Sequence, residues 1–199
     1  MNDKPVCTLV LVRHAASQGD GRFIGQNDEP LSVAGRKQLK HLVAKLSRFR
    51  IEAVYASDLT RTRETAGAVA RRLNLEMKIR PALREMHFGQ WQGLSWRQIT
   101  QRKPRLATRW LRDFPRQQVP GAERFTCFKR RVKQEFKTIV RANQGRRVLV
   151  VTHAGVIRVA LADALGMTDK NIFRLAADPG AISAVEYFLR GVMVRCVNA

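Results

Sequence analysis

Short apolar runs recur along the chain and are typical of buried strands. Five of them are rich in β-branched and aliphatic side chains, so we expect a strand at each. These runs are residues 8–13, 53–56, 148–152, 181–188 and 192–197. A sixth run, residues 77–83, is a weaker candidate because Pro81 interrupts it.

Helical patterns lie between these runs. Apolar residues spaced three or four apart predict helices over residues 35–48, 62–73, 125–140 and 156–165. The last segment is apolar almost all round, so we expect it to be well buried. Strands that alternate with helices favour an α/β fold, in which a mostly parallel central sheet carries helices on both faces.

The stretch from Phe88 to Glu123 breaks this alternation. It contains prolines, tryptophans and many arginines, and it has no clear strand. A chain of 199 residues suits one domain with a modest insertion. We therefore expect a single domain over residues 1–199, with an insertion at about 88–123 on one edge.

Composition narrows the class of protein. Hydrophobic residues make up 45% and charged residues 27%, which excludes a mostly disordered chain. No apolar run approaches the roughly 20 residues that span a bilayer, and the first run lacks the flanks of a signal peptide. We expect a cytoplasmic protein with no membrane partner. Cys7, Cys127 and Cys196 are widely spaced and predict neither a disulfide framework nor a zinc site.

The net charge is unusual. Lys and Arg number 37 and Asp and Glu 16, which gives +21 at pH 7. Such a field attracts phosphorylated metabolites, nucleic acid and acidic membranes alike. Residues 102–116 and 129–137 are basic with interleaved aromatics, as in many nucleic-acid-binding proteins. No recognised nucleic-acid-binding fold accompanies them, so we expect nucleic acid only as a nonspecific partner. A protein that binds anions or nucleic acid is the alternative class of function.

Two of the predicted strands end in the same way. Arg13 and His14 follow the first strand, and His153 follows the strand at 148–152, with small residues after it. Adjacent parallel strands bring their carboxyl ends to one edge of the sheet, where sites form in open α/β folds. We therefore expect both imidazoles at that edge.

Two further segments place polar residues at the same edge. The strand at 53–56 leads into Ser57 and Asp58, either of which we expect to cap the following helix, with Arg61 near its N-terminus. Glu85 follows the 77–83 run and is a candidate proton donor.

Four motifs together resemble those of the histidine phosphatase superfamily, the phosphoglycerate mutase-like branch. They are Arg13-His14, Ser57 with Arg61, Glu85 with Phe88-Gly89-x-Trp91-x-Gly93, and His153-Ala154-Gly155. The segment 21–32 also resembles the family's loop after the catalytic histidine. The match runs from about residue 8 to 197. It implies a phosphoglycerate mutase-like fold with a helical insertion that roofs the site, and neither a metal nor another cofactor.

The resemblance also implies roles for individual residues. His14 is the expected nucleophile, which forms a phosphohistidine, and Glu85 is the expected proton donor. The expected phosphate-binding residues are Arg13, Arg61, His153 and Ala154, and the expected substrate contacts are Ser17 and Gly25. His41 and His87 are expected bystanders. A neutral imidazole suits this reaction because phosphate repels anionic nucleophiles, and guanidiniums can grip the phosphate oxygens in pairs.

The chain departs from the family pattern at two positions. Ala15 and Ala16 stand where the family usually has Gly and Glu. Alanine keeps a close approach to phosphate as long as its φ is negative.

The resemblance further implies a small anionic phosphate monoester as substrate. The chain is short for a mutase, so we expect a phosphatase. The Phe-Gly-x-Trp motif and the segment 120–123 are similar to the α-ribazole phosphatase group, which makes α-ribazole 5′-phosphate the first substrate to test. A phosphoglycerate mutase or a sugar-phosphate phosphatase is the alternative.

The insertion allows two interpretations. Its aromatic and basic residues either contact a nucleotide-like substrate, or pack the insertion onto the core and face solvent. These residues are Trp96, Trp110, Phe114, Arg102, Arg105 and Arg109.

Overall fold

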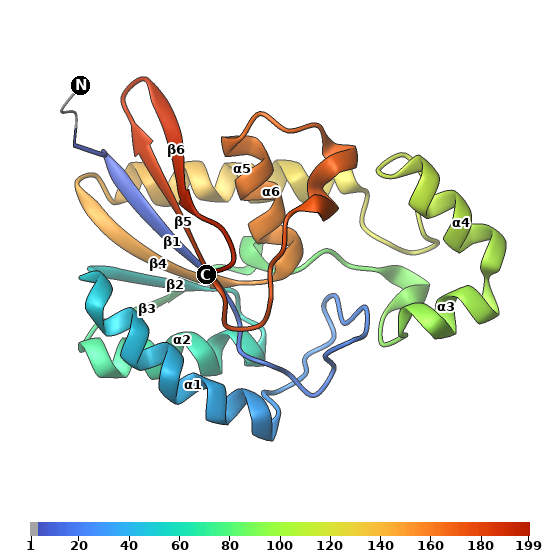
Figure 1. The fold of residues 1–199 in the computed structure, drawn as a ribbon, viewed down its shortest axis with the longest axis horizontal. Coiled ribbons are helices and arrows are strands. Elements are labelled where there is room, and N and C mark those ends of the chain that lie inside the picture. The colour runs from blue at the N-terminus through green and yellow to red at the C-terminus, as the bar shows by residue number, and fades with distance from the viewer. Residues whose placement is uncertain (1–3) are drawn as a thin grey trace.

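A computed structural model describes residues 4–199 and contains one six-stranded sheet (Figure 1). The strands are β1 (Cys7–Arg13), β2 (Ala53–Ala56), β3 (Met77–Ile79), β4 (Arg146–Thr152), β5 (Ile182–Phe188) and β6 (Gly191–Cys196). Their spatial order is β3-β2-β4-β1-β5-β6. The first four run parallel, β5 is antiparallel to β1, and β6 is antiparallel to β5.

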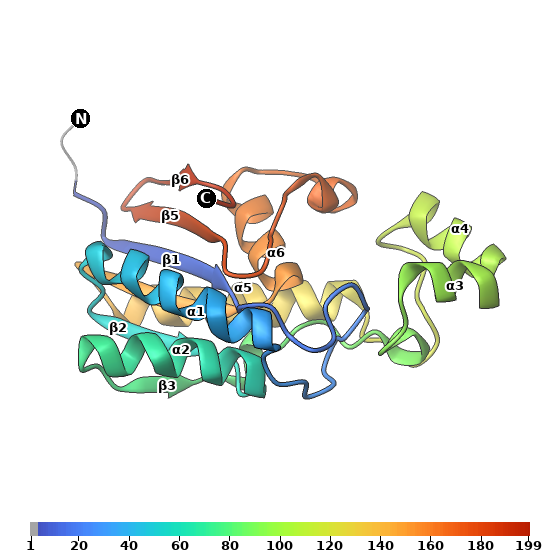
Figure 2. The same cartoon turned by 60° about the horizontal axis from the view of Figure 1, so that its bottom comes forward.

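Helices cover both faces of the sheet (Figures 1 and 2). One face carries α1 (Val33–Leu46) and α2 (Thr60–Leu73), and the other carries α5 (Phe125–Ala142) and α6 (Ala154–Ala164). The segment 88–123, which we expected to be an insertion, contains α3 (Trp96–Arg102) and α4 (Pro104–Asp113), and these helices stand beyond the end of the sheet toward which β1 runs. Short 3₁₀ turns lie at Ser47–Phe49, Pro81–Leu83, Gly89–Trp91 and Asp169–Arg174.

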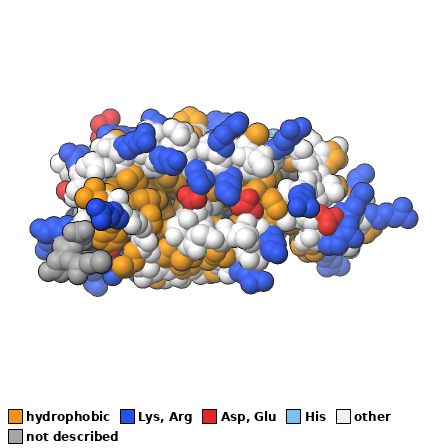
Figure 3. Space-filling view, turned by 90° about the horizontal axis from the view of Figure 1, so that it is seen from above, with side chains coloured by type: hydrophobic (Ala, Val, Ile, Leu, Met, Phe, Trp, Pro, Cys, Tyr) orange, Lys and Arg blue, Asp and Glu red, His pale blue; other side chains and the backbone are white. Residues whose placement is uncertain are grey.

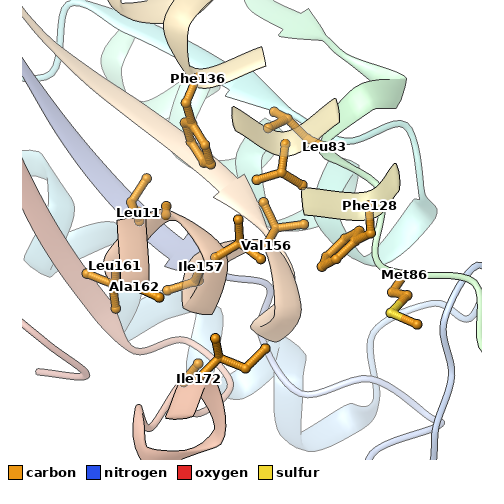
Figure 4. Close-up of a cluster of buried hydrophobic side chains, with 14 of the residues drawn as sticks. Leu11, Leu83, Met86, Phe128, Phe136, Val156, Ile157, Leu161, Ala162 and Ile172 are labelled. Carbon is orange, nitrogen blue, oxygen red and sulfur yellow. The ribbon is translucent and has the colours of Figure 1, made fainter. Parts of the chain in front are cut away.

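Alternation along the strands divides the core into two layers. Leu9 and Leu11 of β1 pack toward α5 and α6, while Val10 and Val12 pack toward α1 and α2. Figure 4 shows the first layer, where Leu11 lies near the α6 side chains Val156 and Ile157. A strand buried on both faces needs a continuous apolar run, and this is why β1 shows no polar alternation.

The fold class predicted from the sequence is confirmed, and two local details are corrected. The strand expected over 77–83 ends at Ile79, because Pro81 starts a 3₁₀ turn instead. Neither Ser57 nor Asp58 is the N-cap of α2. That position is Leu59, and the carboxylate of Asp28 accepts hydrogen bonds from the Thr60 backbone N–H at 2.6 Å and from its hydroxyl at 2.8 Å.

Among the residues that the structure describes, no helix combines the length and the apolar character needed to cross a membrane.

Candidate active site

The two histidines predicted from the strand ends lie side by side. Arg13 is in register with Thr152 across β1 and β4, and the backbone N–H of His14 donates to the Thr152 carbonyl at 3.0 Å. The imidazole centroids of His14 and His153 are 5.3 Å apart, with the rings at 61° to each other. The parallel pairing therefore sets the distance between these side chains.

The imidazole of His14 is held as one tautomer. Its Nδ1 lies 2.8 Å from the carbonyl oxygen of Ala15, which can only accept, so Nδ1 carries the proton and Nε2 keeps a free lone pair. Burial lowers the pKa of His14 well below its usual value, and the charges of Arg13 and Arg61 lower it further. The ring is therefore neutral at physiological pH.

The guanidinium of Arg61 is buried and anchored by the loop that follows His14. Nη1 donates to the carbonyl of Asn27 and Nη2 to that of Gly25, each at 2.7 Å. Asp28 in the same loop binds the N-terminus of α2, as described above. Burial lowers the pKa of Arg61, while the charges of Glu85 and Asp28 act in the opposite direction.

Glu85 is held by two backbone groups. Its Oε1 accepts from the N–H of Met86 and its Oε2 from the N–H of Gly155, both at 2.9 Å. A Cβ on Gly155 would come within 2.3 Å of the carboxylate, so only glycine permits this approach. Arg131 of α5 binds the backbone carbonyl of Glu85 at 3.0 Å and so fixes the segment.

The loop after His14 brings the remaining predicted residues to the site. Ser17 is buried, and its N–H and hydroxyl donate to Asp20 at 3.2 and 3.3 Å. Asp20 also lies 3.5 Å from Arg13. Gly25 adopts φ of 55°, and a Cβ there would meet Gln92 at 2.4 Å. Ala15 does not adopt a positive φ, so alanine is tolerated in place of the family's glycine.

All eight predicted site residues line one cavity of about 540 Å³. They are Arg13, His14, Ser17, Gly25, Arg61, Glu85, His153 and Ala154. The cavity also contains residues that sequence reasoning missed, above all Arg158. It lies one helical turn after Ala154 and therefore on the same face of α6. In the sequence, Arg158 is the one charged residue within the apolar run 156–162, and this could have marked it as a candidate site residue.

The expected insertion meets the cavity through aromatic and aliphatic side chains. Trp96, Trp110 and Leu111 line it, together with Phe23 and Phe173 from outside the insertion. Arg102, Arg105 and Arg109 do not line it and are exposed, which supports the solvated interpretation for them. Phe114 is buried against Phe125 and Phe173, with ring centroids 4.9 and 4.7 Å away, and packs the insertion.

Charge is spread widely over the surface. Figure 3 shows Lys and Arg side chains across one face and at the end formed by α3 and α4, with few Asp and Glu. Inside the cavity the four guanidiniums of Arg13, Arg22, Arg61 and Arg158 face two carboxylates, Asp20 and Glu85. Across residues 4–199, no three His, Cys, Asp or Glu side chains converge as metal ligands would. The cavity is thus suited to an anion.

Comparison with models of protein families identifies the family of this chain. The model of the histidine phosphatase superfamily (branch 1) matches residues 9–199. The chain belongs to the histidine phosphatase superfamily. The resemblance read from the four motifs is thereby confirmed.

Individual proteins are also similar to this chain. A bifunctional protein of Mycobacterium tuberculosis is 34% identical over 194 residues, which cover 96% of this chain and 53% of that protein. The chain therefore spans about half the length of that relative. The adenosylcobalamin/α-ribazole phosphatase of Escherichia coli is 28% identical over 193 residues, covering 96% and 95% of the two chains.

The similarity extends to the three-dimensional fold of a solved structure. The α-ribazole phosphatase of Shigella flexneri superposes with a TM-score of 0.86 at 27% identity, covering 96% of each chain. The mostly parallel sheet with helices on both faces is therefore the histidine phosphatase fold.

The two buried histidines make stability depend on pH. Burial is the main cause that lowers the pKa of both His14 and His153, whereas the unfolded chain binds protons near pH 6.5. Because the unfolded state takes up these protons first, stability is full above about pH 6.5 and falls as the pH drops below it. We expect a slope approaching about 1.4 kcal/mol per pH unit for each histidine.

Urea denaturation between about pH 6.5 and 5.5, above the range where most carboxylates titrate, measures this slope. His14→Gln should remove about half of it and His14→Gln with His153→Asn nearly all. His41→Gln, at an exposed position on α1, is the matched control and should leave it unchanged. An equal slope in the double variant and the wild type would contradict the assignment.

Proposed function

We propose that this histidine phosphatase hydrolyses a small phosphate monoester through a phosphohistidine on His14. The observation that carries the proposal is the neutral His14, with its Nε2 lone pair free, in a cavity that also holds Arg13, Arg61 and Glu85. Phosphoryl transfer asks chiefly for positioning and charge neutralisation, and these residues supply both.

In the first step Nε2 of His14 attacks the phosphorus. The N–P bond forms as the bond to the ester oxygen breaks, and the leaving oxygen takes a proton from the carboxyl of Glu85. Arg13, Arg61, His153 and the N–H of Ala154, at the start of α6, would bind the non-bridging oxygens. The fixed Nδ1 proton of His14 supports this assignment, because it leaves one nitrogen only for attack.

In the second step water attacks the phosphohistidine. The carboxylate of Glu85 takes a proton from that water, the N–P bond breaks, and the electron pair returns to Nε2 of His14. Phosphate leaves, and both residues regain their starting protonation. The two steps balance with the ester, one water molecule and the side chains of His14 and Glu85.

The size and lining of the cavity support a leaving group with an apolar, flat part. A volume of about 540 Å³ suits a drug-sized ligand, whereas a phosphate group fills only the end near His14. Leu111 and Phe173 line the cavity yet are 62% and 50% exposed, which is typical of apolar surface that a ligand covers. We therefore propose α-ribazole 5′-phosphate, which carries an aromatic base, as the first substrate.

The proposed function also indicates the binding partner and the cellular compartment of the protein. The partner is the phosphorylated metabolite, and nucleic acid binds only through nonspecific charge. We propose the cytoplasm as the compartment, where the unpaired thiols of Cys7, Cys127 and Cys196 would remain reduced.

His14→Ala should abolish hydrolysis of an aryl phosphate measured in EDTA, because it removes the Nε2 lone pair that attacks the phosphorus. His41→Ala, which changes an exposed histidine, should keep full activity. The wild type should also yield an acid-labile phosphoenzyme on rapid quench in alkali. Turnover by His14→Ala near the wild-type rate would overturn the mechanism.

Glu85→Gln should slow phosphate transfer from alkyl esters by about 10²- to 10⁴-fold, the usual contribution of a general acid. The same variant should transfer phosphate from a nitrophenyl ester at nearly the wild-type rate, because that alcohol leaves without a proton. Single-turnover kinetics with both esters measure the contrast. An equal loss with both would assign Glu85 a structural role.

Naphthylmethyl phosphate should have a higher kcat/KM than ethyl phosphate, two esters whose alcohols are of similar acidity. Leu111→Ala and Phe173→Ala should reduce the preference about tenfold, the effect of losing one buried apolar contact. Leu189→Ala is the matched control, since that side chain is 85% exposed and lies outside the cavity. A preference that survives both variants would remove these residues from the substrate site.

A further inference from the structure

Two hydroxyl groups behind His153 form a hydrogen-bond chain that leads into the cavity. Ser57 Oγ lies 2.8 Å from His153 Nε2 and 2.8 Å from Thr62 Oγ1. All three side chains are buried, with exposed fractions of 1% or less, so water does not compete for these bonds. The direction of each bond follows from counting protons.

The chain starts at Thr62. Its hydroxyl has one proton, and the carbonyl oxygens of Leu59 and Ser57 lie 2.6 and 2.9 Å away. Carbonyl oxygens can only accept, so the Thr62 proton points to them. Thr62 Oγ1 must then accept from Ser57, because a contact of 2.8 Å between two oxygens requires a proton between them.

This commits the single hydroxyl proton of Ser57 to Thr62. Ser57 Oγ can therefore only accept from His153, so Nε2 of His153 carries a proton. The backbone N–H of Leu59, at 3.4 Å, is a weaker donor to the same oxygen. With Nε2 protonated, the neutral imidazole has a bare lone pair on Nδ1.

Nδ1 of His153 is buried and has no hydrogen-bond partner among the described residues. A buried acceptor without a donor costs free energy, which is the mark of a group that awaits a ligand. The charged groups that act on this ring are Arg13 from β1, Arg61 from α2 and Arg131 from α5, with the neutral His14 beside it. The carboxylate of Glu85 lines the same cavity.

Phosphate oxygens are acceptors, so a bare Nδ1 facing them would be repelled. We propose that Thr62 and Ser57 are positioning residues that hold His153 as the Nε2–H tautomer, so that Nδ1 takes up one proton when phosphate binds. The proton comes from solvent for a dianionic phosphate, or from the P–OH of a monoanion. The new Nδ1–H then donates to a phosphate oxygen. The inference adds to the proposed phosphatase function, but its test needs no turnover.

The tautomer can be read directly from the ligand-free protein. Long-range ¹H–¹⁵N spectra distinguish Nε2–H from Nδ1–H, and the chain has only 4 histidines, with His153→Asn assigning the signal. The wild type should show the Nε2–H form at His153. Thr62→Ser keeps the hydroxyl and should match it. Thr62→Val frees the Ser57 proton to point at Nε2, so His153 should switch to Nδ1–H.

Binding of inorganic phosphate gives the functional readout. Above about pH 7.5 inorganic phosphate is a dianion, so His153 of the wild type must take up one proton when phosphate binds. Thr62→Val already has a proton on Nδ1 and needs none. The Kd of the wild type for phosphate should therefore rise about tenfold more per pH unit than the Kd of Thr62→Val. Thr62→Ser should follow the wild type. An Nδ1–H tautomer in the wild type, or equal pH slopes in the two Thr62 variants, would overturn the proposal. The wild-type spectrum decides it even if Thr62→Val does not fold, and loss of phosphatase activity alone would leave it standing.

Discussion

The parallel pairing of β1 with β4 is the constraint on which the site depends. Its register places Arg13 opposite Thr152, so the residues that follow, His14 and His153, leave the sheet at the same level. Both strands are buried along most of their length, so close packing of side chains on both faces of the sheet holds this register. The loops then need only to add side chains around two imidazoles that the sheet has already brought together.

The sequence was most informative where a residue's position follows from the strand that carries it. His14 and His153 follow short apolar runs rich in β-branched residues, which predict buried strands, and Glu85 belongs to the third of the four motifs. Helix α6 begins at Ala154, directly after β4, because the strand leads into small residues that tolerate a tight turn. These features depend on local pattern, so they are visible without a three-dimensional structure.

Other parts of the site depend on contacts between distant segments and were not visible. Asp28 supplies the hydrogen bonds at the start of α2 from 32 residues away, a role that the local pattern assigned to Ser57 or Asp58. Phe173 reaches the cavity from a 3₁₀ turn near the end of the chain. Arg158 was detectable as a lone charge in an apolar helix, but only the packing of α6 shows that it faces the cavity.

The charge of the whole chain and the charge of the site act at different distances. A net charge of +21 attracts any anion, and salt screens it beyond about 8 Å at physiological ionic strength. Within the cavity the decisive feature is that burial keeps both imidazoles neutral while the guanidiniums beside them stay charged. Among the residues that the structure describes, Arg61 is hydrogen-bonded to two backbone carbonyls and forms no ion pair. A dianion that enters this site meets charged guanidiniums and, at His14, a neutral imidazole with a free lone pair, so the arrangement of charge favours an anionic ligand.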